Sequence, residues 1–213
     1  MDASINGGKP TPERTAWLIQ RLWFAGTAAQ SPTVYAVVDC ARDVRILPLI
    51  QASGCHYKCA LSQPLQQTVL HKAPHIVRLD ANRPFTRTLL SLGWGARWGF
   101  FCVVPKPAVI EMVRQSIGPF LFLNRHDGER QWFNFCDPAV LRGFLPERDW
   151  FTARKFFGPA SEILCEGADP LSVECFRLTD MGVSRVRHPV SLRTPDKEPK
   201  PAIPFFDPQE FLV

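Results

Sequence analysis

Prolines limit what this chain can fold into more than any other feature. The 213 residues include 20 prolines, roughly twice the ordinary usage. A proline inside a helix or a central strand removes a hydrogen-bond donor, so long uninterrupted elements are excluded. Because 46% of the residues are hydrophobic, the chain can still build a sizeable core. The sequence therefore predicts many short elements packed around a common interior.

Short apolar runs alternate with helical patterns in the first two thirds of the chain. The runs TVYAVVDCA from Thr33, HIVRLDAN from His75 and WGFFCVVP from Trp98 are typical of buried strands. Helices are predicted near residues 11–26, 83–95 and 108–118, between or before these strands. This alternation predicts an α/β or α+β fold with a mixed β-sheet flanked by helices.

Turn and cap residues define the following elements. Asp127-Gly128 is a favoured hairpin turn and lies between two aromatic-rich runs within residues 119–135. In FNFCDPAVLRGFLP, Asp137 can cap a helix and Pro138 suits its first position. A further helix within residues 147–159 should end at Gly158 and Pro159.

The pattern of predicted elements changes after residue 160, from alternating strands and helices to short strands. Three short strands are predicted there, two of them joined by a turn at Asp180-Met181-Gly182. Residues 189–204 hold five prolines and no apolar period, which indicates an extended linker. The predicted organisation has four parts: an N-terminal lead and helix (1–32), the main domain (33–160), a small strand-containing extension (161–188), and a Pro-rich tail ending in aromatic residues (189–213).

Composition narrows the range of functions. The net charge of +5 comes from scattered arginines with no basic run, which is a weak signal for nucleic-acid binding. Seven cysteines at irregular spacing do not resemble a disulfide framework and are typical of reduced, buried thiols. No apolar stretch is long enough to span a bilayer. The chain is expected to be cytoplasmic, with no membrane association.

Two groups of residues could hold a metal. Cys55, His56 and Cys59 form a C-H-x-x-C cluster, but no second pair completes the four ligands of structural zinc. His71 and His75 are four residues apart, but Pro74 disfavours the helix that would align them. No metal or other cofactor is predicted.

Catalytic signatures are similarly weak. The glycines of GWGARWG precede a strand, whereas a dinucleotide-binding loop follows one, so a tight turn beneath Trp94 and Trp98 is the better interpretation. Asp39 and Asp80 follow two predicted strands, but no other catalytic group accompanies them. No residue is predicted to be catalytic. The protein is therefore expected not to be an enzyme, although a small hydrolytic enzyme is a remaining alternative.

Five segments together point to a family. They are YAVVDCA (35–41), APHIVRLD (73–80), LLSLGWGARWGFFCVVP (89–105), RQWFNFCDPAVLRGFLP (130–146) and FFGP (156–159). In this order they resemble the type VI secretion adaptor chaperones, often called Tap or TEC, which were first catalogued as a domain of unknown function. The residues that carry the resemblance are Tyr35, Asp39, Trp94, Gly95, Trp98, Gly99, Phe133, Phe135, Asp137, Pro138, Leu141, Phe156, Phe157, Gly158 and Pro159.

The resemblance implies a cytoplasmic adaptor without chemistry of its own. Such a protein binds a specific toxic effector encoded nearby and loads it onto the VgrG spike. The chain departs from the family pattern at Asn134 and Cys136, where the family has arginine and tyrosine. A nucleic-acid-binding module is the main alternative function.

The tail supplies candidate partner-binding residues. Phe205, Phe206, Phe211 and Leu212 cluster in a capped turn that is too short to be stable alone. They should therefore be buried, either against their own domain or in an interface with a partner.

Overall fold

A computed structural model describes residues 11–24, 31–61, 70–105, 108–124 and 128–190. The helices are α1 (Pro12–Trp23), α2 (Ile46–Ala52), α4 (Pro84–Gly93), α5 (Ile110–Ile117), α6 (Pro138–Phe144) and α7 (Trp150–Phe157), with 3-10 turns η1 (Gly118–Leu121) and η2 (Leu145–Glu147). The strands are β1 (Thr33–Asp39), β2 (Tyr57–Cys59), β3 (Pro74–Leu79), β4 (Gly99–Val104), β5 (Phe122–Asn124), β6 (Arg130–Trp132), β7 (Glu162–Glu166), β8 (Ser172–Thr179) and β9 (Gly182–Pro189).

Seven strands form one sheet in the order β2-β3-β1-β4-β7-β8-β9, and β5 pairs with β6 in a separate hairpin. The α+β class expected from the sequence is confirmed, and so are helices on both faces of the sheet. The sheet is not mixed, because every described strand pair is antiparallel. Helices between strands suggested parallel crossovers, but these connections return the chain in the opposite direction.

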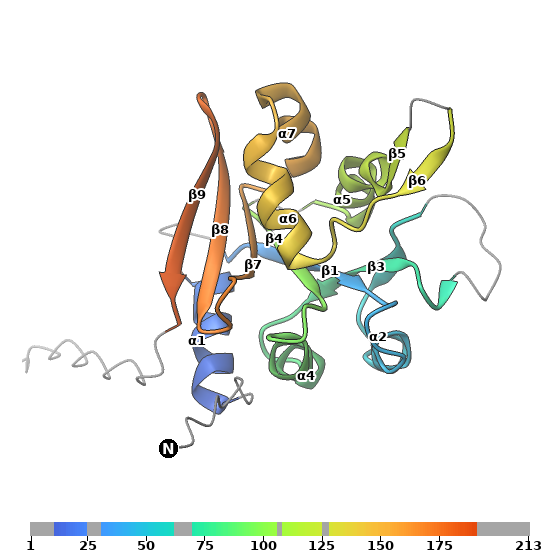
Figure 1. Cartoon of the computed structure of the whole chain (residues 1–213). Helices are drawn as coiled ribbons and strands as arrows, with labels where there is room; N and C mark the ends of the chain where they lie inside the picture. Colours follow the sequence, from blue (N-terminus) through green and yellow to red (C-terminus); the bar gives the residue numbers. More distant parts are fainter. Residues whose placement is uncertain (1–10, 25–30, 62–69, 106–107, 125–127, 191–213) are drawn as a thin grey trace, which may run out of the picture.

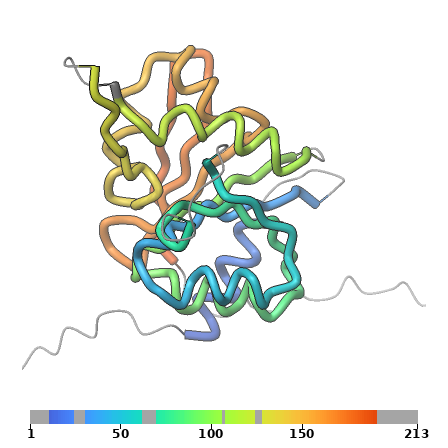
Figure 2. The backbone as a smooth tube through the Cα atoms, turned by 90° about the vertical axis from the view of Figure 1, so that its right-hand side faces the viewer, coloured from blue at the N-terminus to red at the C-terminus, as the bar shows by residue number. Residues whose placement is uncertain are grey.

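The sheet separates two cores (Figure 1). Helices α1, α2 and α4 cover one face, and α5, α6, α7 and the β5–β6 hairpin cover the other. Figure 2 shows the same two layers from the side, with the yellow-green segments above the sheet. Strand β1 supplies both cores because successive side chains point to opposite faces: Val34 and Ala36 enter the first core, and Tyr35 and Val37 the second.

The predicted strands after residue 160 are present and continue the main sheet. Strand β7 pairs with β4 at the centre of the sheet, with Phe101 opposite Leu164. Strands β8 and β9 extend it further, and their turn has Thr179 opposite Gly182, as the Asp180-Met181-Gly182 signal predicted. Residues of β7 and β8 contribute to both cores.

The predicted caps determine where several helices begin and end. Thr11 Oγ1 accepts the Arg14 amide at 3.2 Å at the start of α1. Asp137 caps α6, with Pro138 at its first position. Gly158 ends α7 with φ +54°, a left-handed conformation that favours glycine. Within the described residues, no helix combines the length and apolar character needed to cross a membrane.

The cysteines are free thiols, as the sequence predicted. Cys40, Cys102, Cys136, Cys165 and Cys175 are buried, whereas Cys55 and Cys59 are half-buried. Burial raises the pKa of both Cys40 and Cys102 to about 12 and that of Cys175 to about 11. These thiols are therefore protonated and poorly nucleophilic at neutral pH.

Candidate functional site

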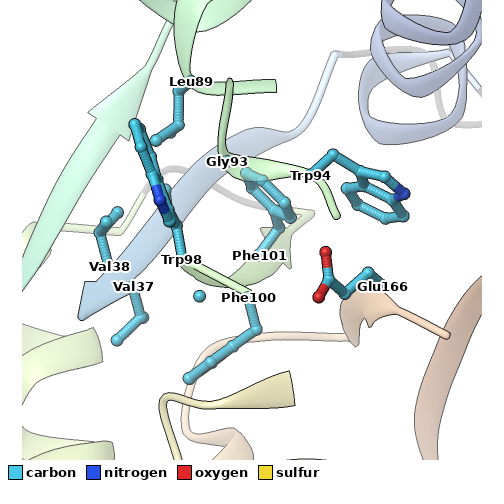
Figure 3. A pocket seen from close by; sticks show the side chains of 11 residues that line it. Val37, Val38, Leu89, Gly93, Trp94, Trp98, Phe100, Phe101 and Glu166 are labelled. Atoms are coloured by element: carbon cyan, nitrogen blue, oxygen red, sulfur yellow. The ribbon is translucent and has the colours of Figure 1, made fainter. Parts of the chain in front are cut away.

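Part of the family motif forms the turn between α4 and β4. The side chains of Trp94 and Trp98 are 6% and 4% exposed, and both belong to the core beneath α4 (Figure 3). Trp94 stacks on Phe101 with ring centroids 6.3 Å apart, and its Nε1 donates to the Pro170 carbonyl at 3.0 Å. The cavity between these side chains is about 10 Å³, so it holds at most a single water. The two indoles are core residues, and this cavity is not a ligand site.

A carboxylate from β7 holds this turn. Glu166 accepts the Gly95 amide at 2.5 Å, and its side chain points toward the segment that carries Trp94 (Figure 3). Burial raises the pKa of Glu166, although the amides of Gly95 and Arg97 partly oppose that shift. Positive φ angles at Gly95 (+85°) and Arg97 (+60°) help the turn wrap around the carboxylate.

The other motif residues meet in the opposite core. Phe135 contacts the Phe156 ring edge-on, with centroids 5.1 Å apart, and Leu141 and Phe157 are buried in the same cluster. The Tyr35 hydroxyl donates to the Ala108 carbonyl at 2.5 Å, which ties β1 to the start of α5. Phe133 is half-buried against this cluster, and Pro159 is also half-buried. These residues form the core that supports α5–α7.

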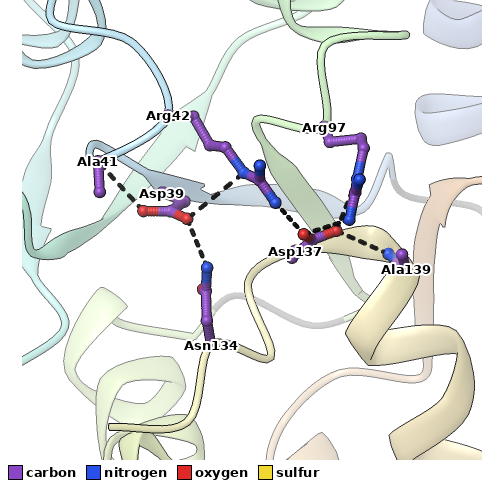
Figure 4. A network of polar contacts seen from close by, with 7 residues as sticks. All are labelled: Asp39, Ala41, Arg42, Arg97, Asn134, Asp137 and Ala139. Atoms are coloured by element: carbon purple, nitrogen blue, oxygen red, sulfur yellow. Dashed lines mark hydrogen bonds and ion pairs between the residues drawn. The ribbon is translucent and has the colours of Figure 1, made fainter.

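Asp39 and Asp137 lie in one polar network between the two motif groups (Figure 4). Asp137 accepts the Ala139 amide at 2.9 Å as a helix cap, and it also pairs with Arg42 and Arg97. Asp39 accepts the Ala41 amide at 3.0 Å, and its other oxygen accepts the Asn134 amide group at 2.9 Å. The network joins the end of β1, the α4–β4 turn and the start of α6.

Sequence reasoning identified Asp137 as a cap but missed the arginines that bind it. Arg42 follows Asp39 by three residues, and Arg97 lies between the two tryptophans of GWGARWG. Arg97 lies inside an otherwise apolar motif, and this was the signal that could have indicated an ion pair. Its partner could not be read from the sequence because Asp137 is 40 residues away.

Replacing Asp137 with alanine should therefore cost more than a helix cap alone. We expect the free energy of unfolding to fall by about 2–3 kcal/mol, since the change removes the cap and leaves two arginines without their carboxylate. The arginines remain partly exposed, which limits the loss. Chemical denaturation measures the change.

Asp149→Ala is the matched control, because Asp149 is exposed and caps α7 through the Thr152 amide at 3.0 Å. It should cause a clearly smaller loss than Asp137→Ala. Equal losses in the two variants would show that the arginine pairs contribute nothing.

The residues considered as a carboxylate pair and as metal ligands do not come together to form a site. Strands β1 and β3 are antiparallel, with Val34 opposite Leu79, so Asp39 and Asp80 lie toward opposite ends of the strand pair. Cys59 is in β2, and Cys55 precedes that strand. Across the described ranges, no three histidine, cysteine or acidic residues are placed to hold a metal ion.

Exposed apolar side chains recur on the layer that covers the second core. These side chains belong to α5 and its N-cap, the β5–β6 hairpin and α7. We call them the exposed apolar set: Val109, Met112, Leu123, Trp132, Trp150 and Phe151. The layer stands above the sheet in Figure 1. Exposed apolar side chains mark a protein-binding surface where they lie together, and within this set the rings of Trp150 and Phe151 are in contact.

Trp150 and Phe151 are the most pronounced pair of the exposed apolar set. Their rings contact edge to face with centroids 5.3 Å apart, and Phe151 is 79% exposed. The cap at Asp149 fixes the backbone of the first turn of α7, from which both side chains project. Aromatic side chains are frequent binding anchors.

The four candidate residues of the tail, Phe205, Phe206, Phe211 and Leu212, lie outside the described residues. Their role stays a prediction.

Comparison with known families gives one match. The family described as "Domain of unknown function (DUF4123)" matches residues 34–150. The match spans β1 to the start of α7 and includes both Asp39 and Asp137. No curated protein and no solved structure matches the chain.

Proposed function

The chain belongs to the DUF4123 family, and from that premise we propose that it is a cytoplasmic adaptor chaperone of type VI secretion. It binds a toxic effector encoded nearby and promotes the loading of that effector onto the VgrG spike. The exposed apolar set is the observation that carries the proposal. The ordered resemblance of the motifs to the adaptor chaperones supports the choice of partner.

The proposal assigns different roles to the buried motif residues and to the exposed rings of α7. The motif residues pack the two cores and the polar network, so they act as a scaffold. The scaffold holds α7, on which Trp150 and Phe151 face solvent. An effector that covers these rings would remove apolar surface from water, which stabilises the complex by about 25 cal/mol per Å² before the costs of association.

Co-expression with the neighbouring effector tests the proposal. The effector should co-elute with the full chain at both low and high salt, because a largely apolar interface resists screening. Phe151→Ala should weaken binding by about tenfold or more, as expected for an aromatic anchor. The matched control is Val44→Ala, a residue 90% exposed on the loop before α2.

The outcomes separate the alternatives. If no effector co-elutes at any salt, the adaptor proposal is wrong. If nucleic acid co-purifies and is lost steeply as salt rises, the chain is a nucleic-acid-binding module instead. Loading is tested separately: purified effector should associate with VgrG faster when the chain is present.

A further inference from the structure

Strand β9 forms a long edge of the sheet in the described part of the chain. It is the last strand of the sheet, and β8 is its one neighbour among the described strands. It has eight residues, whereas the opposite edge, β2, has three. Short edge strands protect a sheet from pairing with other chains, and β9 lacks that protection.

The register shows which backbone groups face outward. A two-residue turn is closed by a hydrogen-bonded pair, here Thr179 and Gly182. Hydrogen-bonded and non-hydrogen-bonded pairs then alternate along an antiparallel ladder. The amides and carbonyls of Val183, Arg185 and Arg187 therefore point away from β8. They present a row of donors and acceptors at the edge.

The arginines of β9 do not shield this row. Arg185 and Arg187 each donate from Nε to Glu174 at 2.8 Å, and Glu174 is a buried residue of the neighbouring strand β8. Both guanidinium groups are therefore drawn back over the face of the sheet. Charged side chains that extend beyond an edge would oppose pairing, whereas these two are paired with Glu174 on the face of the sheet.

A pocket adjoins the same strand on the face covered by α1. It has a volume of about 350 Å³, and Arg21, Glu162, Cys175, Arg177, Val186 and His188 line it. Glu162 is shared by Arg21 and Arg177, at 2.7 and 2.9 Å. One carboxylate against two guanidinium groups leaves positive charge in excess. Because Arg177 is 62% exposed, it can reach a second anion.

We propose that β9 binds an extended, acidic segment of a protein partner by strand addition, with one acidic side chain of that segment entering the pocket beside Arg177. Backbone pairing supplies affinity in such complexes, and pockets for alternate side chains supply specificity. The inference deepens the proposed function, because it describes how the effector would bind. The identity of the partner as an effector rests on the proposed function. It places contacts outside residues 34–150, in strands that the family match does not cover.

Charge disfavours a second copy of this chain as the occupant. Antiparallel pairing of two β9 strands about Val186 would set Arg185 of one copy opposite Arg187 of the other. Like charges directly opposite each other destabilise a strand pair. The chain's own residues 191–213 are also poorly suited, because their five prolines lack the amide that a ladder needs.

Amide exchange measured by NMR on the full chain tests the binding mode without the effector. In the free protein the amides of Val183, Arg185 and Arg187 should exchange quickly, and those of Ser184, Val186 and His188 slowly. The probe is a short peptide of alternating glutamate and valine, and the control peptide replaces glutamate with lysine. The acidic peptide should slow exchange at the three outward amides, whereas the basic peptide should not.

A charge reversal tests the pocket. Arg177→Glu should weaken binding of the acidic peptide by about tenfold, since it places a carboxylate beside Glu162. The matched control Arg87→Glu makes the same charge change on an exposed position of α4 and should bind like the original chain. Melting temperatures of both variants report whether the fold is kept.

Each outcome decides the inference. If the two peptides slow exchange at the three outward amides equally, or if neither does, the strand-addition inference is wrong, whether or not the effector binds. If the free protein instead shows slow exchange at all six amides and the mass of a dimer, a second copy of the chain occupies the edge, and the strand-addition inference is wrong. If the original chain binds effector and Arg177→Glu binds it equally well, the adaptor function stands and the strand-addition mode is wrong. If the acidic peptide binds as expected but the effector does not, only the adaptor function fails.

Discussion

Replacing Trp98 with alanine is expected to lower the free energy of unfolding by about 3–5 kcal/mol, the usual cost of removing a large aromatic side chain from a core. Trp98 is 4% exposed and packs so closely on Gly93 that a Cβ added to that glycine would lie 3.0 Å from the indole ring. The cavity left by the indole cannot collapse easily, because the α4–β4 turn is also held by Glu166. Chemical denaturation and soluble yield measure the effect.

Trp132→Ala is the control for this prediction. Trp132 is 40% exposed on the β5–β6 hairpin, so its loss should cost less than about 1 kcal/mol. A Trp98→Ala variant that stays as stable as Trp132→Ala but no longer binds the effector would show that Trp98 is a contact residue, contrary to its position in the core.

The second large effect is expected for Gly99→Ala. A Cβ at residue 99 would lie 1.9 Å from the Val37 carbonyl oxygen in β1. Backbone atoms of a central strand cannot move aside as a flexible side chain can, so the β1–β4 pair would have to separate locally. We expect a loss of about 3 kcal/mol or more, seen as a lower denaturation midpoint or as insoluble protein.

The same substitution at Gly143 provides the comparison. Gly143 lies in α6, and a Cβ added there would meet no atom within 4 Å beyond its chain neighbours and the backbone of its own helix. Alanine at this position should be neutral or should stabilise the helix by up to about 1 kcal/mol. If the two glycine variants behaved alike, close approach of β1 and β4 would not be the reason for glycine at residue 99.

Local signals in the sequence predicted local structure well. Thr11, Asp137 and Gly158 mark real helix ends, since capping and left-handed φ angles depend on residues a few positions apart. The buried strands were also identifiable from short apolar runs. Strand β2 was missed, because three half-exposed residues carry no clear period.

Long-range pairing could not be predicted in the same way. The placement of β7 beside β4 joins segments about 60 residues apart, and nothing near either strand specifies the partner or its direction. The arginines that bind Asp137 come from two separate turns for the same reason. The sequence grouped the motif residues by their order along the chain, but their division between two cores required the structure.

The position of β7 also has a consequence for synthesis on the ribosome. Strand β4 and helices α5–α7 emerge before β7 does, so during that interval the Phe100–Val103 edge has no partner on that side. An apolar strand edge exposed in a nascent chain is prone to pair with the wrong segment. The centre of the sheet closes only when residues 162–166 have left the exit tunnel, and the turn at Gly95 gains its carboxylate at the same moment. Completion of this sheet is therefore a late event in the life of the nascent protein.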